Sequence, residues 1–392
     1  MSSLLDELSL QHPLKIGIIG GGQIGKMIAQ EAKRMSLKVV ILDPNKNCPA
    51  SSLCDKLIVA DFKDEDKIIE LAKYSDVITY EIELANSEAL KKLELKNYPI
   101  FPSPHSLYII QNKFRQKKFL QENNLPVPAF KKITSINDLL MVAKRFEYPL
   151  MLKACEDSYD GRGNYLIKCK EDIPIAYNSF DNREIFAEKY VDFKTEISIM
   201  VARNKKGQIT TFPIAENFHL NNVLDTTIVP ANISPKTYET AEIIAKNVVA
   251  CLNDIGIFGI EMFISYNGDI FINEIAPRPH NSGHYSIEGC SISQFEQHIR
   301  TILNFPLVKP ELVRATVMKN ILGPPNFSGN YRIIGMSKLL SLPSTKIHLY
   351  GKNLTSPGRK LGHITCTGPV LDEVIKRSSY AKNSIEIISD YK

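Results

Sequence analysis

Residues 274–284 read Glu-Ile-Ala-Pro-Arg-Pro-His-Asn-Ser-Gly-His, and they follow the apolar run Ile270-Phe271-Ile272. A core strand would not carry so many polar side chains, because each polar group buried without a partner costs about 1–3 kcal/mol. The two prolines fix φ and favour an extended conformation for the residue before each of them. We therefore predict a strand that delivers a metal-binding carboxylate, followed by a rigid loop that holds an anion.

The preceding segment predicts the partner of this strand. Residues 257–264 and 269–274 flank Asn267-Gly268, which is a strong hairpin-turn signal. Glu261 and Glu274 would then face each other. A single acidic residue in such a strand usually lies at an edge or on the surface, but two facing carboxylates repel each other unless a cation lies between them. Hard oxygen ligands suit Mg²⁺ that carries nucleotide phosphates, so we predict that these two residues hold this ion.

A glycine-rich turn stands near the start of the chain. Gly20-x-Gly22-x-x-Gly25 follows an apolar strand at 15–20 and precedes a helix at about 26–35, as phosphate-binding turns do. Strands expected at 38–42, 56–60 and 77–80, with a helix at about 64–73, predict a doubly wound α/β domain over about residues 13–102. Asp43 is nearly placed to hold a ribose, which by itself suggests NAD. A tight turn without a ligand and a turn for a substrate phosphate are the alternatives.

The middle of the chain offers candidate nucleotide-binding residues. We expect one polar helix at about 106–123, a strand–loop–strand lid with glycines at 158–164, and strands at 184–191 and 195–202. Lys113 and Lys153 would neutralise phosphate, unless they are surface lysines whose stems cover apolar neighbours. Glu188-Lys-Tyr-Val191 and Glu196 could line a nucleoside, although a plain exposed strand end fits the spacing better. Helices are expected at about 237–252 and 291–304, and short strands and turns at about 313–368.

Composition narrows the class of protein. A chain of 392 residues is expected to form two to four domains, and its hydrophobic content of 44% and charged content of 23% fit a soluble globular protein. The net charge of +5 suits anionic small molecules, and no clustered basic stripe indicates nucleic acid. The seven scattered cysteines predict neither a disulfide framework nor a zinc site. No signal peptide and no window of about 18 apolar residues is found, so we expect a cytoplasmic protein without a membrane span.

Five motifs, taken together and in order, resemble one family. They are Gly20-Gly-Gly-Gln-Ile-Gly25, Thr79-Tyr-Glu-Ile-Glu83, Ser158-Tyr-Asp-Gly-Arg-Gly-Asn164, Asn273-Glu-Ile-Ala-Pro-Arg-Pro-His-Asn-Ser-Gly-His284, and Tyr350-Gly-Lys352 with Pro357-Gly-Arg-Lys360 and Gly362-His363. The chain is similar over about residues 13–370 to the N5-carboxyaminoimidazole ribonucleotide synthetases, the ATPase subunits of phosphoribosylaminoimidazole carboxylase. These enzymes belong to the ATP-grasp superfamily.

The resemblance implies a mixed α/β and α+β architecture, the ATP-grasp fold. Its expected parts are a doubly wound, Rossmann-like N-terminal domain at 13–104, a mobile lid with a linker helix at 105–190, a central domain at 191–312 and a small β-rich C-terminal module at 313–392. The implied reaction is a step of purine biosynthesis. It joins bicarbonate to the amine of 5-aminoimidazole ribonucleotide, with ATP cleaved to ADP and phosphate through carboxyphosphate. Either carboxyphosphate or CO₂ released from it would meet the amine. The family further implies Mg²⁺, with Mn²⁺ as an alternative, a homodimer, and a separate mutase or carboxylase as partner.

The resemblance also implies a role for each candidate residue. Glu261 and Glu274 would bind the metal ion. The residues expected to bind ATP are Lys113, Lys153, Glu188, Lys189, Val191, Glu196, His219 and Asn273. Bicarbonate and carboxyphosphate would be held by Arg278, His280 and Asn281. The aminoimidazole ribonucleotide would be bound by Gly22, Gln23, Glu81, Tyr159, Asp160, Arg162, Lys352 and Arg359, with Asp160 near the amine as a candidate base. On this view the glycine turn serves the substrate and not a dinucleotide.

Two departures from the family pattern leave other functions open. Glu156 and Asp157 place two negative charges beside the lid, and Asn232 stands where relatives usually have arginine. Both changes could weaken ATP binding. The alternatives are another ATP-grasp ligase, which the 278–284 string disfavours, and an inactive relative that serves as a scaffold for a carboxylase. The four residues Lys113, Lys153, Glu261 and Glu274 argue against the scaffold.

Overall fold

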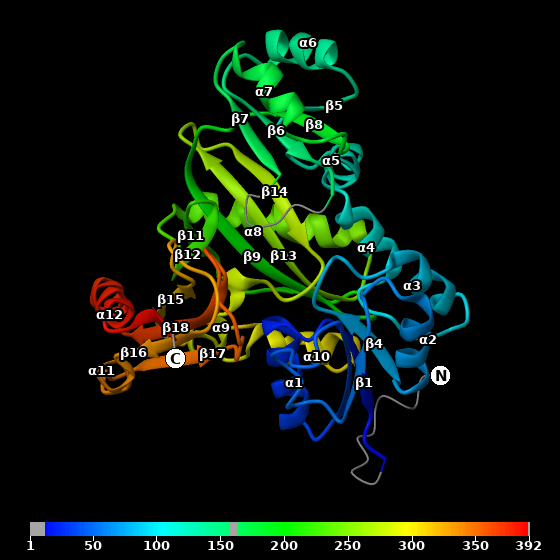
Figure 1. The fold of residues 1–392 in the computed structure, drawn as a ribbon, viewed down its shortest axis with the longest axis vertical. Coiled ribbons are helices and arrows are strands. Elements are labelled where there is room, and N and C mark those ends of the chain that lie inside the picture. Colours follow the sequence, from blue (N-terminus) through cyan, green and yellow to red (C-terminus); the bar gives the residue numbers. More distant parts are fainter. Residues whose placement is uncertain (1–11, 157–162, 391–392) are drawn as a thin grey trace.

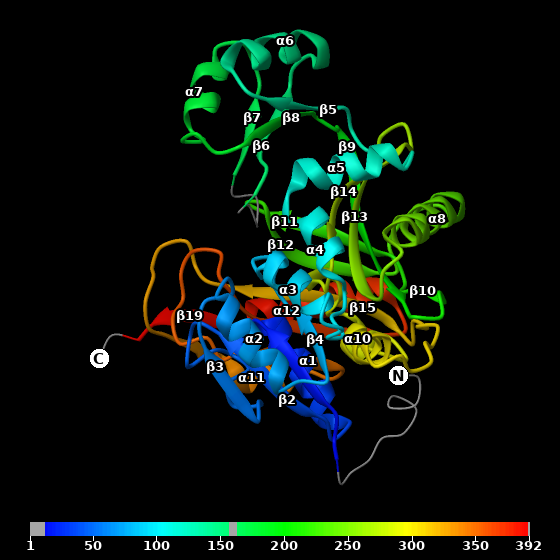
Figure 2. The ribbon, with the colours of Figure 1, turned by 90° about the vertical axis from the view of Figure 1, so that its right-hand side faces the viewer.

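The computed structural model describes residues 12–156 and 163–390. A small lid sheet lies at one end of the molecule, a long central sheet crosses the middle, and the N-terminal and C-terminal parts lie side by side at the other end (Figure 1). A view from the side shows the same order (Figure 2). The N-terminal and C-terminal parts, which are far apart in the sequence, therefore lie next to each other.

The N-terminal part is a four-stranded parallel sheet with strand order β3-β2-β1-β4. Strands β1, β2 and β4 are apolar and mostly buried because helices cover the sheet, whereas the edge strand β3 is partly exposed. The core on the α1 side also contains Phe295 and Ile299 from a helix late in the chain, and Tyr350 from the C-terminal part. The elements are β1 (Lys15–Ile19), α1 (Gln23–Arg34), β2 (Lys38–Asp43), β3 (Lys56–Val59), α2 (Glu65–Lys73), β4 (Val77–Tyr80) and α3 (Ser87–Glu94).

The single polar helix expected at 106–123 is wrong, because two helices occupy this stretch. Helix α4 (Pro104–Gln111) ends before Asn112, and α5 (Lys113–Glu122) begins after it. Asn112 has an extended backbone, and its side chain accepts a hydrogen bond from the Arg115 amide at 3.0 Å, which caps α5. The interruption places Lys113 in the first turn of α5. This helix lies between the lid sheet and the central sheet (Figure 2).

The lid is a four-stranded sheet with strand order β5-β8-β6-β7 and its own core. The expected hairpin is confirmed, since β6 and β7 pair antiparallel. Asp157 and residues 158–162 at its tip lie outside the described residues. The lid elements are β5 (Phe130–Ile133), α6 (Ile136–Phe146), β6 (Leu150–Ala154), β7 (Asn164–Ile167), α7 (Asp172–Asn178) and β8 (Ile185–Lys189).

The central sheet holds nine strands in the order β14-β13-β9-β11-β12-β15-β18-β17, with β10 paired to β9. The hairpin around Asn267-Gly268 is confirmed by the antiparallel pairing of β13 and β14. Helix α8 packs against one face of the sheet. These elements are β9 (Phe193–Arg203), β10 (Ile209–Thr211), β11 (Ala215–Leu220), β12 (Val223–Val229), α8 (Pro235–Leu252), β13 (Gly256–Ser265), β14 (Ile270–Ala276), η1 (Asn281–Gly283), α9 (Ser286–Gly289) and α10 (Gln294–Ile302).

The C-terminal part continues this sheet and is richer in regular structure than the short strands and turns expected at 313–368. Strand β15 pairs with β12, so the hydrogen bonding runs unbroken from the central part into the C-terminal part. A helix, α12, packs on β15 and β18. The elements are β15 (Ala315–Leu322), β16 (Tyr331–Ile334), α11 (Met336–Leu340), β17 (Thr345–Leu349), β18 (Lys360–Gly368), α12 (Leu371–Asn383) and β19 (Glu386–Ser389), with β16 paired to β19. Across the described residues, every helix is too short or too polar to span a membrane.

Candidate active site

Two acidic residues face each other on the β13–β14 hairpin. In the pairing of β13 with β14, Glu261 lies opposite Glu274 and Met262 lies opposite Ile272. Asn273 therefore has no register partner on β13 and forms a β-bulge. A bulge adds one residue to a strand and breaks the alternation of its side chains. Asn273 and Glu274 are accordingly both partly exposed although they are neighbours, whereas Ile272 and Ile275 on either side are buried. The edge of the sheet thus presents two adjacent polar side chains beside Glu261.

A third and a fourth group join this pair. One oxygen of Glu196, one oxygen of Glu261 and one ring nitrogen of His219 lie within 4.8 Å of one another. Burial, together with the charges of Glu196 and Glu274, raises the pKa of Glu261 to about 8. Three carboxylates crowded in a partly buried place fit a divalent cation, which would relieve their repulsion. Glu261 and Glu274 supply the oxygen ligands that Mg²⁺ prefers, and His219 beside Glu196 has its pKa raised by that carboxylate despite opposing burial.

Both predicted phosphate lysines lie beside carboxylates of the site. Lys113 Nζ is 2.9 Å from Glu274 Oε2, and Lys153 Nζ is 3.0 Å from Glu188 Oε2. Sequence reasoning missed Lys117, which is 2% exposed and lies one turn after Lys113. Its Nζ donates to the Ile272 carbonyl at 2.9 Å and lies 3.2 Å from Glu188 Oε1, and burial lowers its pKa to about 8. The i, i+4 spacing from Lys113 was the available signal.

The predicted nucleoside residues lie where the lid meets the central sheet. Glu188 is buried, and two lysines hold its carboxylate and lower its pKa against the effect of burial. The Lys189 amide donates to the Ala129 carbonyl at 2.8 Å, so this N–H is already paired within the protein. Val191 follows the end of β8 and is partly exposed.

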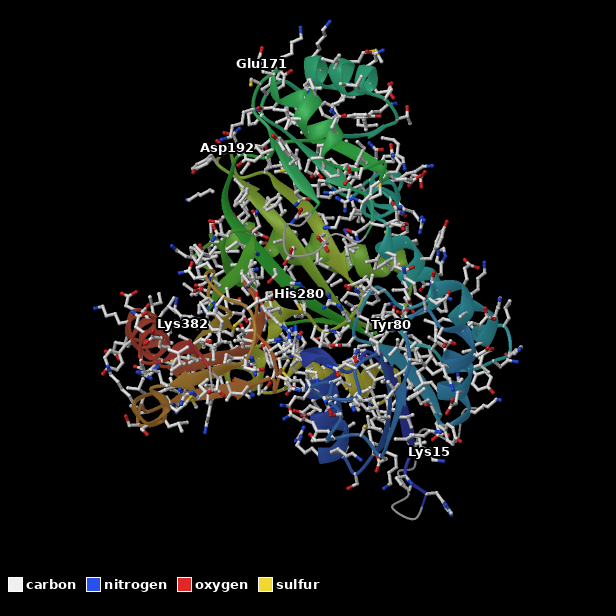
Figure 3. The ribbon with its side chains drawn as sticks, in the orientation of Figure 1. Lys15, Tyr80, Glu171, Asp192, His280 and Lys382 are labelled. Carbon is white, nitrogen blue, oxygen red and sulfur yellow. The ribbon has the colours of Figure 1, made fainter. Side chains whose placement is uncertain are left out.

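The predicted anion loop follows β14 directly. Arg278 Nη2 is 2.8 Å from Glu83 Oε1, which ties the loop to the segment after β4. His280 Nδ1 lies 2.8 Å from Ser282 Oγ, and burial beside Arg278 holds the pKa of His280 well below its usual range. His280 Nε2 lies 3.6 Å from Glu261 Oε1, in the middle of the molecule (Figure 3). The buried amide of Asn281 has no hydrogen-bond partner within the described part of the chain. These groups offer positive charge and unsatisfied donors to a small anion.

Carboxylates of the protein fill the glycine-rich turn. Glu81 accepts hydrogen bonds from the Gly22 amide at 2.5 Å and the Gly25 amide at 2.9 Å. Asp43 accepts from the Gly21 amide at 2.8 Å and is only 6% exposed. In a dinucleotide site the turn amides would hold a pyrophosphate and the acidic residue a ribose. Here the turn amides and the Asp43 carboxylate are already hydrogen-bonded to each other or to Glu81. This arrangement argues against a dinucleotide such as NAD at the turn.

The turn nevertheless lies beside the C-terminal part. Lys26, in the first turns of α1, donates to the Leu349 carbonyl at 3.0 Å and the Tyr350 carbonyl at 3.2 Å. Lys352 follows this contact, so the structure brings it toward the N-terminal helix that also carries Gln23. Arg359 is exposed just before β18. Tyr159, Asp160 and Arg162 lie outside the described residues.

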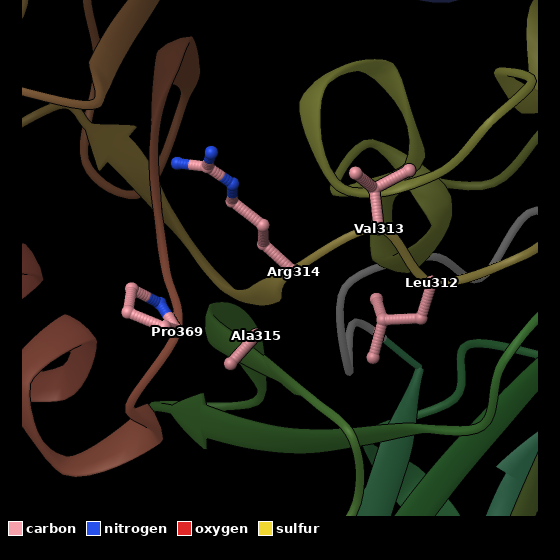
Figure 4. Close-up of a pocket in the computed structure, with 5 residues that line it drawn as sticks. All are labelled: Leu312, Val313, Arg314, Ala315 and Pro369. Atoms are coloured by element: carbon pink, nitrogen blue, oxygen red, sulfur yellow. The ribbon is translucent and has the colours of Figure 1, made fainter.

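The two departures contact different parts of the structure. Glu156 Oε1 accepts a hydrogen bond from Asn112 Nδ2 at 2.9 Å, at the start of α5 and near Lys113. Asn232 is exposed, and its amide donates to Glu216 Oε2 at 3.2 Å. The charge of Glu156 is therefore the one placed to affect phosphate. A separate surface hollow lined by Leu312, Val313, Arg314, Ala315 and Pro369 includes none of the predicted site residues (Figure 4).

A lid sheet above a central sheet, with lysines and paired carboxylates between them, defines the protein as an ATP-grasp protein. Family models agree: the ATP-grasp domain matches residues 118–295, the ribonucleotide synthetase preATP-grasp domain matches 14–111, and the phosphoribosylaminoimidazole carboxylase C-terminal domain matches 316–377.

Individual relatives narrow the class to one family. The N5-carboxyaminoimidazole ribonucleotide synthase of Bacillus subtilis is 38% identical over 92% of this chain and 93% of its own. The structure of the synthetase from Thermotoga maritima is similar with a TM-score of 0.87 and 42% identity, over 96% of this chain and all (100%) of that one. A structure of the Aspergillus clavatus synthase with ADP and 5-aminoimidazole ribonucleotide has a TM-score of 0.88 and 33% identity, over 95% and 98% of the two chains. This chain belongs to the N5-carboxyaminoimidazole ribonucleotide synthetase family.

Proposed function

We propose that the protein is an ATP-grasp ligase that carboxylates the amine of 5-aminoimidazole ribonucleotide with bicarbonate, forming N5-carboxyaminoimidazole ribonucleotide, ADP and phosphate in purine biosynthesis. The observation that carries the proposal is the continuity of β14 with the anion loop. Glu274, beside the phosphate lysines, is four residues from Arg278 and six from His280. One short segment therefore joins a nucleotide-phosphate site to an anion site. The relatives named for this activity support it.

The chemistry proceeds in two steps. A bicarbonate oxygen attacks the γ-phosphorus of ATP, ADP leaves, and carboxyphosphate forms. The substrate amine then takes the carboxyl carbon, phosphate leaves and the amine loses a proton. Lys113 and Lys153 would neutralise phosphate charge, while Arg278 and Asn281 orient the bicarbonate by charge-assisted and neutral hydrogen bonds. His280 is neutral in this environment and acts as a hydrogen-bonding group rather than a fixed cation.

A divalent metal ion, when bound, would neutralise the charge of the ATP phosphates during phosphoryl transfer. We propose Mg²⁺ as this ion, held by Glu261 and Glu274, with Mn²⁺ as a substitute. The ribonucleotide is proposed to lie between α1 and the C-terminal part, near Gln23, Lys352 and Arg359. The homodimer, the separate mutase or carboxylase partner and the cytoplasmic location stay predictions from the sequence.

The test is ADP release by the purified protein with Mg-ATP, with bicarbonate and the ribonucleotide added separately and together. Release that requires the ribonucleotide and rises with bicarbonate is the expected result. Release that ignores the ribonucleotide but responds to another amine or carboxylate would identify a different ligase. ATP binding without release under any of these conditions would favour the inactive scaffold.

A further inference from the structure

Two glutamines outside the proposed machinery are buried against the segment that carries it. Gln116 is 2% exposed and Gln294 is fully buried, at 0%. Each makes the same kind of contact, in which one carboxamide bonds both the N–H and the C=O of a single residue. A buried carboxamide with both ends bonded holds a backbone position in register, because a shift would leave buried polar groups unpaired.

Gln116 holds the edge strand next to the metal-site carboxylate. Its Oε1 accepts from the Ile275 amide at 3.0 Å, and its Nε2 donates to the Ile275 carbonyl at 3.2 Å. Strand β14 is at the edge of the central sheet, and within residues 12–156 and 163–390 no strand pairs with its outer side. Ile272 is held on the same side, where its amide donates to the Pro126 carbonyl at 2.8 Å and its carbonyl accepts from Lys117. Asn273 and Glu274 lie between these two anchored positions.

Gln294 holds the anion loop in the same way. Its Oε1 accepts from the His280 amide at 2.9 Å, and its Nε2 donates to the His280 carbonyl at 2.7 Å. Because the His280 N–H must be the donor, the orientation of the carboxamide is fixed, and Nε2 also donates to His284 Nδ1 at 3.0 Å. The Gly283 backbone packs so closely on this side chain that an added Cβ would lie 2.4 Å from Gln294 Oε1. The side chain thus fills the inside of the loop.

We propose that Gln116 and Gln294 are positioning residues that fix the two ends of residues 275–280, so that Glu274 and His280 keep their separation along the chain. Gln116 acts on the metal-site end and Gln294 on the anion end. Both carboxamides bond the backbone of this segment, Gln116 at Ile275 and Gln294 at His280, so both act through the backbone and not through a side chain assigned to substrate. This inference rests on the proposed function, because it assigns the two ends to different substrates.

The experiment replaces each carboxamide by methionine, in Gln116→Met and Gln294→Met. Gln297→Met is the matched control, since Gln297 is equally buried on α10 but bonds the Val308 carbonyl at 2.7 Å, away from the loop. We expect Gln294→Met to lower kcat/KM for bicarbonate by about 10²-fold, as small misplacements do, with KM for Mg-ATP within about twofold of the unmodified protein. We expect Gln116→Met to weaken Mn²⁺ binding in the presence of ADP by about tenfold, an effect in the usual range for a group that orients a ligand.

Two further measurements keep the outcome decisive. Amide exchange of the peptide spanning 275–284 should accelerate in Gln116→Met and Gln294→Met and stay unchanged in Gln297→Met. If a methionine variant does not fold, Gln116→Glu and Gln294→Glu replace it. A glutamate oxygen can still accept the hydrogen bond from the backbone N–H, so these variants should lose less activity or Mn²⁺ affinity than expected for methionine. The proposal would be overturned if Gln294→Met impaired the use of Mg-ATP as much as the use of bicarbonate. It would also be overturned if Gln116→Met and Gln294→Met lost no more activity or Mn²⁺ affinity than Gln297→Met. If the unmodified protein releases no ADP, the proposed function fails, and the exchange and Mn²⁺ comparisons still decide the positioning roles.

Discussion

Glu261 lies directly across from Glu274 in the β13–β14 pairing, and Lys113 Nζ lies 2.9 Å from the Glu274 carboxylate. The ammonium group stands beside one member of a carboxylate pair that is crowded by Glu196 as well. Glu261 and Glu274 would hold a metal ion that neutralises the charge of the ATP phosphates, and Lys113 would contact phosphate beside them. The pair is therefore central to the proposed reaction.

Replacing Glu274 tests this assignment directly. Glu274→Gln keeps the shape of the side chain and removes its charge, so we expect kcat to fall by about 10³-fold, in the range seen when a group that stabilises transition-state charge is lost. The unfolding temperature should stay within a few degrees, since the residue is partly exposed. Glu239→Gln, at an exposed position of α8, serves as the control for charge removal. Normal turnover in Glu274→Gln would contradict the metal assignment.

Metal binding should depend on pH through Glu261. Its pKa is raised to about 8, so below that pH a proton competes with the metal ion. Mn²⁺ affinity without nucleotide, measured by electron paramagnetic resonance, should therefore rise about tenfold per pH unit between pH 6 and 7.5 and then level off. In the metal-free protein the raised pKa stabilises the fold at low pH, and this contribution is lost as the pH rises toward 8. Glu261→Gln should flatten both dependences, and an unchanged slope would refute the role of Glu261.

The ion pair between Arg278 and Glu83 should both stabilise the fold and hold the anion loop in position. Both side chains are largely shielded, at 16% and 29% exposed, so loss of one partner leaves a poorly solvated charge. A double-mutant cycle with Glu83→Gln and Arg278→Met should give a coupling of about 1–3 kcal/mol in the free energy of unfolding. Glu83→Gln alone should also raise KM for bicarbonate. A coupling near zero would show that the two side chains do not depend on each other.

Buried neutral histidine should make the fold sensitive to acid. Burial lowers the pKa of His298 to about 3, and its Nε2 lies 2.9 Å from Thr79 Oγ1. The stability from this depressed pKa is present above the ordinary value of 6.5 and is lost as the pH falls from there toward 3. One pH unit below the ordinary pKa, the loss is about 1.4 kcal/mol. Urea unfolding at pH 7.5 and 5.5 measures the fall in the free energy of unfolding. In His298→Gln this fall should be smaller than in the unmodified protein by about this amount, whereas in the exposed control His105→Gln it should equal that of the unmodified protein.

The glycine turn should tolerate an added methyl group at one position and not at another. A Cβ at Gly25 would lie 2.4 Å from the Gly20 carbonyl oxygen, which is backbone and cannot rotate away, so Gly25→Ala should destabilise the fold by about 1–3 kcal/mol. A Cβ at Gly22 would instead meet the end of the Glu81 side chain at 2.4 Å. Since that carboxylate can move, Gly22→Ala should cost less stability. Thermal unfolding of the two variants measures the difference, and equal losses would contradict it.

Local patterns in the sequence were sufficient for much of the fold. The β1–turn–α1 unit follows from an apolar run and closely spaced glycines, and the β13–β14 hairpin follows from Asn267-Gly268. The break between α4 and α5 was missed, because Asn112 is neither proline nor glycine and its role as a helix cap depends on the tertiary environment. The partner of Arg278 was missed too, although Glu83 stands in a motif that drew attention to Glu81. No local pattern distinguishes the carboxylate that caps a helix from the one that binds a guanidinium.

The sequence by itself determined which residue types and which short elements the protein has, because turn chemistry and hydrophobic periodicity act over a few residues. Only the tertiary structure decided which of these elements meet. Strand β15 pairs with β12 across a long intervening stretch, Glu81 fills the turn at Gly22 from 59 residues away, and Gln294 holds a loop that precedes it by 14 residues. Such contacts depend on satisfying every buried donor and acceptor of the whole fold at once, a condition that no short window of sequence contains.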